Sequence, residues 1–339
     1  MNSRERVRRA IAFRAPDRIP YFHRFLDATR ERYPELVSSI EARYPGDMAS
    51  SCWYNPAIKV TSSEREGAHL IMDEWGCTRA TGIEGLTGIA VDHPLADYSA
   101  LEGYEWPDYR DLCDWDRVAD VLRQDPELYH AGMKPILNPF ERMQALRGFE
   151  RLMFDLAENR PELYELRDRV VEVMIVVVNL WAQTDVDAVN FGDDWGTQTN
   201  LMISPQMWRT FFRPVYERLF EPVKRAGKFI QFHSCGMVLP IIPELIDLGV
   251  DIVNVQHNLI GLDCLRQFCG EVCFLTAMDS QLILPYRSPV DVRQHVREVF
   301  EALGTRDGGI IGYAPLGPDV LPENIEALYA AYVEFGAFP

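Results

Sequence analysis

The sequence is poor in positive charge. It has 34 lysine and arginine residues against 51 aspartate and glutamate residues, which gives a formal net charge of −17 at pH 7. A surface this acidic repels phosphate backbones and anionic lipid headgroups, and no basic run interleaved with aromatic residues offsets it. We therefore expect that the protein binds neither nucleic acid nor membrane surfaces.

Long hydrophobic runs are also missing. The most apolar stretch, Val170–Ala182, contains Glu172 and Asn179, whereas a membrane span needs roughly 18 uninterrupted apolar residues. The N-terminus, MNSRERVRRAIAF, has no apolar core of a secretory signal, which predicts a cytoplasmic protein.

The cysteines are few for a disulfide framework. Seven cysteines are an odd number in a large chain without an export signal, so we expect reduced thiols. Cys264, Cys269 and Cys273 are close in sequence, but their spacing is not typical of zinc or iron–sulfur sites. We expect them to pack in the core.

Short apolar runs alternate with helical segments. Five runs in the second half have the length of strands that are buried on both faces: Val186–Asp194, Lys228–Ser234, Val250–Gln256, Glu271–Asp279 and Gly308–Pro315. Three weaker candidates precede them: Arg18–Phe25, His69–Gly76 and Leu128–Leu137. Ser-Pro pairs at Ser204 and Ser288 and Leu-Pro at Leu321 mark the starts of helices.

This alternation predicts right-handed βαβ units. Eight such units in 339 residues predict an α/β fold, a (β/α)8 TIM barrel with N-terminal helical additions. No linker or low-complexity segment divides the chain, so residues 1–339 are expected to form a single domain. A doubly wound open sheet is the alternative, but no glycine-rich dinucleotide-binding loop follows a predicted strand.

Polar residues gather at the predicted strand ends, where barrels of this kind build their active sites. We expect catalytic roles for Asp193, Asp194 and Tyr313. We expect substrate contacts from His23, Glu74, Asn138, Gln256, His257 and Asp279, while Asp73, Glu141 and Gln281 also lie at strand ends.

Two pairs at strand ends admit more than one interpretation. His233 and Cys235 are either packing residues or half of a metal or thiol site, since metal sites need three or four ligands. Asp193 and Asp194 either cap a helix or form an ion pair, or their mutual repulsion raises one pKa and suits it to acid–base chemistry. Side chains alternate along a strand, so only one of the two should face the cavity, and we favour Asp194.

Several stretches resemble a known family. They are NSRERVRRAIAFRAPDRIP, DEWGCTR, FERMQALRGFERLMFDLAEN, NFGDDWGTQTNLMISPQMWRTFFRPVYERLF, FHSCGMVLPIIPELIDLGVDIVN and PDVLPENIEALY. Together they are similar to the uroporphyrinogen decarboxylase superfamily, whose members are (β/α)8 barrels. The haem-pathway decarboxylases carry an arginine-rich loop that grips porphyrinogen carboxylates, whereas this chain reads YFHRFLDATRERY there. The resemblance is therefore to the corrinoid-dependent methyltransferase branch.

That resemblance implies a zinc site. Enzymes similar to the methylcobalamin:coenzyme M methyltransferases bind zinc through a His-x-Cys pair and, usually, a cysteine in the loop after the eighth strand. His233 and Cys235 match the pair, but the last loop, IIGYAPLG, has neither cysteine nor histidine. Either a substitute ligand completes the site or no zinc binds. The candidate substitutes are Asp193, Asp194, His257 and Asp279.

The resemblance also implies an activity and partners. The chain would move a methyl group between a small molecule and a corrinoid protein, with zinc or a carboxylate activating the heteroatom. The small molecule would be a methoxy-aromatic (O-demethylation), a methylamine, a methylthiol, or a thiol or pterin acceptor. The chain lacks the DxHxxG cobalamin motif, so a cobalamin-binding partner protein would bring the corrinoid in trans. We leave open whether the chain forms a homodimer.

Two alternatives stand beside this hypothesis. One is a metal-free decarboxylase in which Asp193 or Asp194 stabilises a cationic intermediate and His233 or Tyr313 supplies the proton. The other is a barrel that binds a ligand without catalysis.

Overall fold

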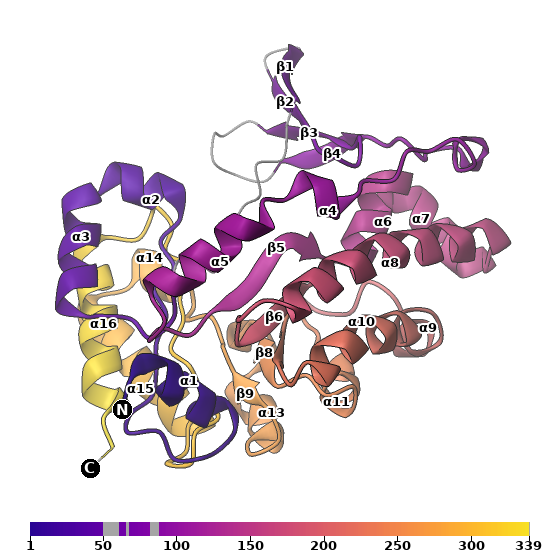
Figure 1. The fold of residues 1–339 in the computed structure, drawn as a ribbon. Helices are drawn as coiled ribbons and strands as arrows, with labels where there is room; N and C mark the ends of the chain where they lie inside the picture. Colours follow the sequence, from indigo (N-terminus) through magenta and orange to yellow (C-terminus); the bar gives the residue numbers. More distant parts are fainter. Residues whose placement is uncertain (50–60, 66–67, 82–87, 339) are drawn as a thin grey trace.

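The computed structural model describes residues 1–339 except 50–60, 66–67, 82–87 and 339. Its centre is a set of five parallel strands in chain order: β5 (Ala131–Leu137), β6 (Ala188–Gly192), β7 (Phe229–His233), β8 (Ile252–Asn254) and β9 (Cys273–Phe274). Helices cover these strands on the outside (Figure 1). The apolar runs of the sequence are explained by this double burial.

Three short bridged segments close the five strands into a barrel. Phe274 pairs in parallel with Ile310, and Tyr21 pairs in parallel with Gly312. Met48 pairs in parallel with Tyr129, just before β5. The Asp47 amide donates to the Tyr21 carbonyl at 2.9 Å, so segments 21–25, 47–49 and 310–316 complete the ring. The predicted (β/α)8 barrel is confirmed.

The second barrel strand is not the predicted one. Segment His69–Gly76 overlaps β2 (Ala68–Met72), which belongs to an antiparallel sheet of order β1-β2-β3-β4. Its neighbours β1 (Thr61–Arg65) and β3 (Thr78–Thr81) occupy both of its edges, so β2 cannot also pair in the barrel. An apolar run has the same appearance in either sheet, and the true second segment at 47–49 is too short for a periodicity signal.

This antiparallel sheet, completed by β4 (Ile89–Asp92), stands at one end of the molecule in Figure 1. Its β2–β3 turn is anchored on α6 (Pro139–Arg147), the helix that follows β5: Asp73 pairs with Arg142 at 2.6 Å. The Arg142 guanidinium also lies 4.8 Å from the centre of the Trp75 ring. The sheet is therefore an insertion on the side of the barrel where β5 ends.

The helix starts read from the sequence are confirmed. The Ser204 hydroxyl accepts from the Met207 amide at 3.1 Å at the start of α9 (Pro205–Met207), which a π-helical turn joins to α10 (Arg213–Arg225). Ser288 forms a capping box with Asp291 before α15 (Pro289–Leu303). The last helix is α16 (Pro322–Gly336).

The remaining α-helices lie between the barrel strands or after them. They are α2 (Asp27–Arg32), α3 (Pro34–Arg43), α4 (Tyr109–Leu112), α5 (Trp115–Gln124), α7 (Phe149–Glu158), α8 (Pro161–Ala182), α11 (Ile242–Asp247), α12 (His257–Ile260), α13 (Leu262–Leu265) and α14 (Ile283–Tyr286).

Helix α1 (Ser3–Ile11) is the expected N-terminal addition and covers the amino ends of the strands. Its Val7 and Ile11 pack in one apolar cluster with barrel residues such as Ile252. Arg4 and Arg8 both reach the buried Asp187 at 2.8 Å. This end of the barrel is filled, and a ligand must enter from the other end.

Two further expectations concern the chain as a whole. The six described cysteines outside residues 50–60 are all free thiols, and Cys52 lies outside the described residues. In the part of the chain that the structure describes, no helix combines the length and apolarity needed to cross a membrane.

Candidate active site

A cavity of about 250 Å³ occupies the barrel at the carboxyl ends of its strands. The apolar lining comes from the first, second and last segments of the ring, from β5 and from the residue after β9: Phe22, Leu26, Met48, Met133, Leu275 and Pro315. The polar lining comprises Asn190, Asp194, Gln231, His233, Asn254 and Tyr313. Arg24 and Glu141 complete the charged lining. A small molecule with one apolar and one polar face fits this division.

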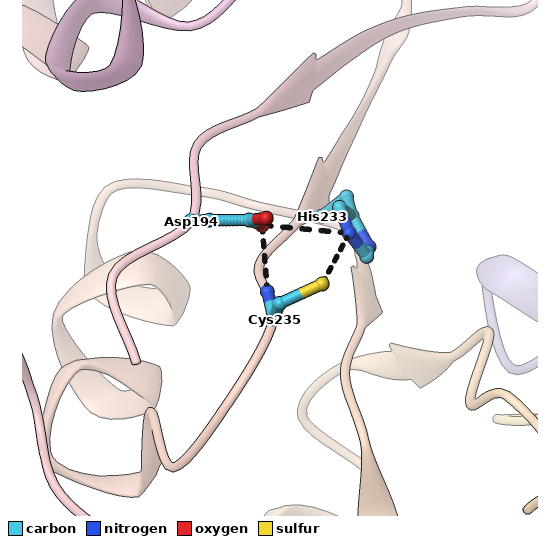
Figure 2. A group of neighbouring side chains, drawn as sticks. All are labelled: Asp194, His233 and Cys235. Atoms are coloured by element: carbon cyan, nitrogen blue, oxygen red, sulfur yellow. Dashed lines mark hydrogen bonds and ion pairs between the residues drawn. The ribbon is translucent and has the colours of Figure 1, made fainter. Parts of the chain in front are cut away.

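Three side chains converge on the polar side of the cavity. The Cys235 Sγ lies 3.3 Å from the His233 Nε2, and the Asp194 Oδ1 lies 3.6 Å from the same nitrogen. Figure 2 shows the three side chains pointing toward one another from the ends of β6 and β7. All three ligand atoms lie within 4.8 Å of one another, and among the described residues this is the group of three that could hold a metal ion.

The orientation of His233 is fixed from behind by Asn254. The Asn254 Nδ2 donates to the Leu275 carbonyl, so its Oδ1 is turned toward the His233 Nδ1. An oxygen acceptor requires that Nδ1 carries the proton, which leaves the Nε2 lone pair facing Cys235 and Asp194. This is the tautomer that a metal-ligating histidine needs.

Cys235 is held in a place that disfavours its free thiolate. Burial, and then the neighbouring Asp194 carboxylate, raise the pKa of Cys235 to about 12. The Asp194 Oδ1 also accepts the Cys235 amide at 2.9 Å, which fixes the two residues together. Such a thiol stays protonated until a cation compensates its charge.

Glu141 brings a second carboxyl group to the cavity. It belongs to the first turn of α6, and its pKa is raised by burial and by the nearby Asp194. The Glu141 carboxyl group therefore keeps its proton to a higher pH than an exposed glutamate does. Glu141 and Asp194 are the two carboxyl groups in the described cavity lining.

The adjacent aspartates have separate environments. Asp193 is completely buried and accepts from the amides of Phe140 at 2.7 Å and Glu141 at 2.8 Å, and from the Tyr216 hydroxyl at 2.6 Å. It caps the N-terminus of α6 and lies outside the cavity lining, because alternation along the chain turns it away from Asp194. The structure thus places Asp194, rather than Asp193, on the cavity.

Three of the expected substrate contacts point elsewhere. His23 packs edge-on against Tyr329 of α16 at 4.8 Å between ring centres, since the odd-numbered residues of segment 21–25 face outward. Glu74 lies in the inserted sheet and accepts from the Tyr109 hydroxyl. Asn138 precedes α6, and its side-chain amide donates to Glu141 at 3.3 Å.

The other three hold loops rather than line the cavity. Gln256 accepts the Gly236 amide at 2.7 Å and so supports the loop that carries Cys235. His257 bonds the Thr276 hydroxyl at 2.8 Å and faces His295 at 3.2 Å. Asp279 accepts the amides of Gln281 and Leu282, both at 2.9 Å. Neither His257 nor Asp279 reaches the His233 cluster.

The buried His257 predicts a pH-dependent stability. Burial, and then the facing His295, lower the pKa of His257 from 6.5 to about 4, opposed by Asp279. The unfolded chain binds the proton more tightly, so this stability is present above pH 6.5 and is lost as the pH falls toward 4.

Between neutral pH and pH near 4.5, the wild type should lose about 2 kcal/mol more unfolding free energy than the His257→Asn variant. Urea unfolding at the two pH values measures both losses. Comparing the two pH-dependent losses cancels the acidic groups that both proteins share. Identical losses would show that His257 does not titrate in this range.

Four polar lining residues were not predicted from the sequence. Arg24, Asn190, Gln231 and Asn254 all lie within strand segments rather than after them. A signal was present: each of the runs VNFGDD, IQFHS and IVNVQ has a carboxamide inside an otherwise apolar strand. Buried carboxamides in a barrel strand point either to a bonded core or to a ligand.

Tyr313 does lie on the cavity, as expected. Its ring stacks on Phe22 with 6.1 Å between ring centres, and the Arg24 guanidinium lies close to its hydroxyl. Burial raises the pKa of Tyr313, so the hydroxyl stays protonated.

Comparison with known proteins shows the family of this chain. The family model described as uroporphyrinogen decarboxylase (URO-D) matches residues 136–335, which include the whole Asp194–His233–Cys235 cluster. The chain belongs to the uroporphyrinogen decarboxylase family.

Curated relatives of this chain are distant. A uroporphyrinogen decarboxylase of Magnetococcus marinus is 27% identical over 199 residues, covering 55% of this chain and 51% of the relative. One from Thermus thermophilus is 22% identical over 163 residues, covering 48% of this chain and 45% of the relative. The chain spans about half the length of the curated relatives it matches.

A solved structure extends the similarity to the whole chain. A methyltransferase from Methanosarcina mazei superposes with a TM-score of 0.72 and covers 99% of both chains at 15% sequence identity. At this identity the likeness shows the fold, which agrees with the closed barrel described above.

Proposed function

We propose that this chain is a metal-dependent methyltransferase that moves a methyl group between a small molecule and a corrinoid carried by a partner protein. One observation carries the proposal: Asp194, His233 and Cys235 present an oxygen, a nitrogen and a sulfur within 4.8 Å of one another on the wall of the cavity. The fold shared with a methyltransferase supports it.

The three donors fit zinc. Tetrahedral zinc with bonds of about 2.0–2.3 Å places a nitrogen and a sulfur ligand roughly 3.6 Å apart, and a nitrogen and an oxygen roughly 3.4 Å apart. The corresponding distances are 3.3 Å for His233 to Cys235 and 3.6 Å for His233 to Asp194. Asp194 would supply the third ligand that the last loop lacks. A site with three protein ligands would keep one position for substrate, as in catalytic zinc sites.

Zinc, when bound, lowers the pKa of a thiol or hydroxyl in that position and so makes it a better nucleophile or leaving group. The protein's own residues prepare the place. Asn254 holds the His233 ring, and Gln256 holds the Gly236 amide beside Cys235. Glu141, with its raised pKa, takes up or releases the proton that the reacting heteroatom exchanges.

The lining disfavours the haem-pathway reaction. Arg24 is the one arginine or lysine among the lining residues, while Glu141 and Asp194 are acidic. A porphyrinogen with many carboxylates would meet more repulsion than attraction here. A small neutral substrate fits both the charge and the volume of about 250 Å³.

The test uses the full chain, loaded with zinc, and free methylcobalamin in place of the partner protein. We expect consumption of methylcobalamin in the presence of simple thiols, or methylation of cob(I)alamin by methoxy-aromatics. The corrinoid absorption spectrum measures either reaction. Chelator-treated protein is the control and should be inactive. Transfer that is equal with and without metal, or absent in both directions from protein of confirmed zinc content, would contradict the proposal.

A further inference from the structure

Two carboxamides on the cavity wall make no hydrogen bond within the described protein. Asn190 and Gln231 both line the cavity and are 7% and 5% exposed. The Asn190 Oδ1 and the Gln231 Oε1 are buried and have no partner among the described residues. A buried amide without a partner is costly, by a free energy comparable to a lost hydrogen bond.

The pair is arranged as one binding surface. Asn190 on β6 lies directly opposite Gln231 on β7 in the parallel register, and Gly192 lies opposite His233 two residues further on. Each carboxamide offers a donor and an acceptor at its tip. Two residues along a strand correspond to about 7 Å, so the pair lies about 7 Å deeper than the His233 level.

A third carboxamide nearby shows that this arrangement is unusual. Asn254, on the next strand, is also 5% exposed, yet both ends of its side chain are bonded, to His233 and to the Leu275 carbonyl. Of these three neighbouring strands, β8 therefore carries an amide that is bonded at both ends, while β6 and β7 carry amides without partners among the described residues.

No charged residue of the described lining lies at the depth of the pair. Ala131, Met133 and Met48 are apolar neighbours in the lining. The charged lining residues lie toward the mouth: Asp194 and Glu141 follow strand ends, and the Arg24 carbonyl accepts the Leu316 amide at the end of the last segment. An anionic group at the depth of the pair would be buried without a counter-charge, which is unfavourable.

We propose that Asn190 and Gln231 form a receptor for the neutral polar head group of the substrate, an amide-type or similar group with a hydrogen-bond donor and acceptor side by side. The substrate would then have an apolar middle of about ring size, since about 7 Å separates the head group from the His233 level. Placing the reacting end at the metal cluster rests on the proposed function. The head-group receptor does not, because it can be measured without metal.

The test compares three ligands with one para-methoxyphenyl scaffold on metal-stripped full-length protein: para-methoxybenzamide, its isostere para-methoxybenzoate, and para-methylanisole, which lacks the polar head group. Titration calorimetry should give the neutral amide at least about tenfold tighter binding than either of the others, the scale expected for a satisfied buried hydrogen bond. Equal affinity for all three ligands would overturn the proposal, and so would tighter binding of the benzoate.

Apolar variants of similar volume supply a second readout. Asn190→Leu and Gln231→Met should each remove the preference for the amide, and each should raise the melting temperature, because an unbonded buried amide disappears. Asn254→Leu is the matched control and should lower the melting temperature, because it breaks two bonds. Loss of stability in Asn190→Leu and Gln231→Met, with the amide preference kept, would show that the pair is structural. Failure of methyl transfer with an intact amide preference would overturn only the proposed function.

Discussion

Replacing His233 or Cys235 by alanine should abolish methyl transfer, with a loss of about a thousandfold or more in turnover, and leave the melting temperature within a few degrees of the wild type. Each variant would remove one of the three proposed metal ligands, and metal-assisted activation supplies several kcal/mol to such reactions. The His233 side chain is 38% exposed at the cavity, so its truncation opens no sealed void in the core.

Cys269→Ala is the matched control for this result. Cys269 is also partly buried, but its thiol bonds the Ala302 and Leu303 carbonyls, away from the cavity. Its alanine variant should keep both metal and activity. If the His233 or Cys235 variant instead lost much stability and kept normal activity per folded molecule, these residues would belong to the core.

The adjacent aspartates should give opposite results when each is changed to asparagine. Asp193→Asn should cost about 2–4 kcal/mol of unfolding free energy, because the buried carboxylate accepts from two helix amides and a tyrosine hydroxyl, and an amide cannot satisfy all three. Urea unfolding measures this loss. Its activity per folded molecule should fall less, since Asp193 lies outside the cavity lining.

Asp194→Asn should lose about a hundredfold or more in turnover with little change in melting. The Asp194 side chain is 37% exposed, so its replacement disturbs little packing, but an amide is a poor zinc ligand beside a thiol. Steady-state kinetics on both variants at matched zinc content separates the two roles. Small and equal kinetic effects would mean that the pair is structural and that the chemistry rests on His233 and Cys235.

The barrel could be predicted because its signals are local. Runs such as Phe229–His233 are apolar over the whole length of a strand, and the Ser204 and Ser288 caps fix the helix starts. The sequence predicts His69–Gly76 as the second barrel strand, whereas the structure has segment 47–49 there, and the sequence holds no signal for this difference. A strand shows its own periodicity but not its partners, and partners decide between a barrel and an inserted sheet.

The candidate site, too, could be predicted only in part. Strand-end position located His233, Cys235 and Asp194, because the carboxyl ends of parallel strands meet at one mouth. It also drew in His257, whose side chain bonds Thr276 behind the barrel wall. The sequence does not tell which side chains near a strand end face the cavity when the boundary of the strand is uncertain by one residue. A shift of one residue turns each side chain to the opposite face. The buried amides Asn190 and Gln231 lie inside paired strands, so strand-end position does not predict them.

The central claim is that Asp194, His233 and Cys235 together hold a zinc ion that the last loop does not help to bind. Elemental analysis combined with zinc X-ray absorption on the purified full chain tests this claim most directly. We expect one zinc per chain with a single sulfur at about 2.3 Å and nitrogen or oxygen ligands at about 2.0–2.2 Å, and Cys235→Ala should remove the sulfur contribution. A chain purified without zinc that does not take it up, or a zinc ion with two or more sulfur ligands, would contradict the account.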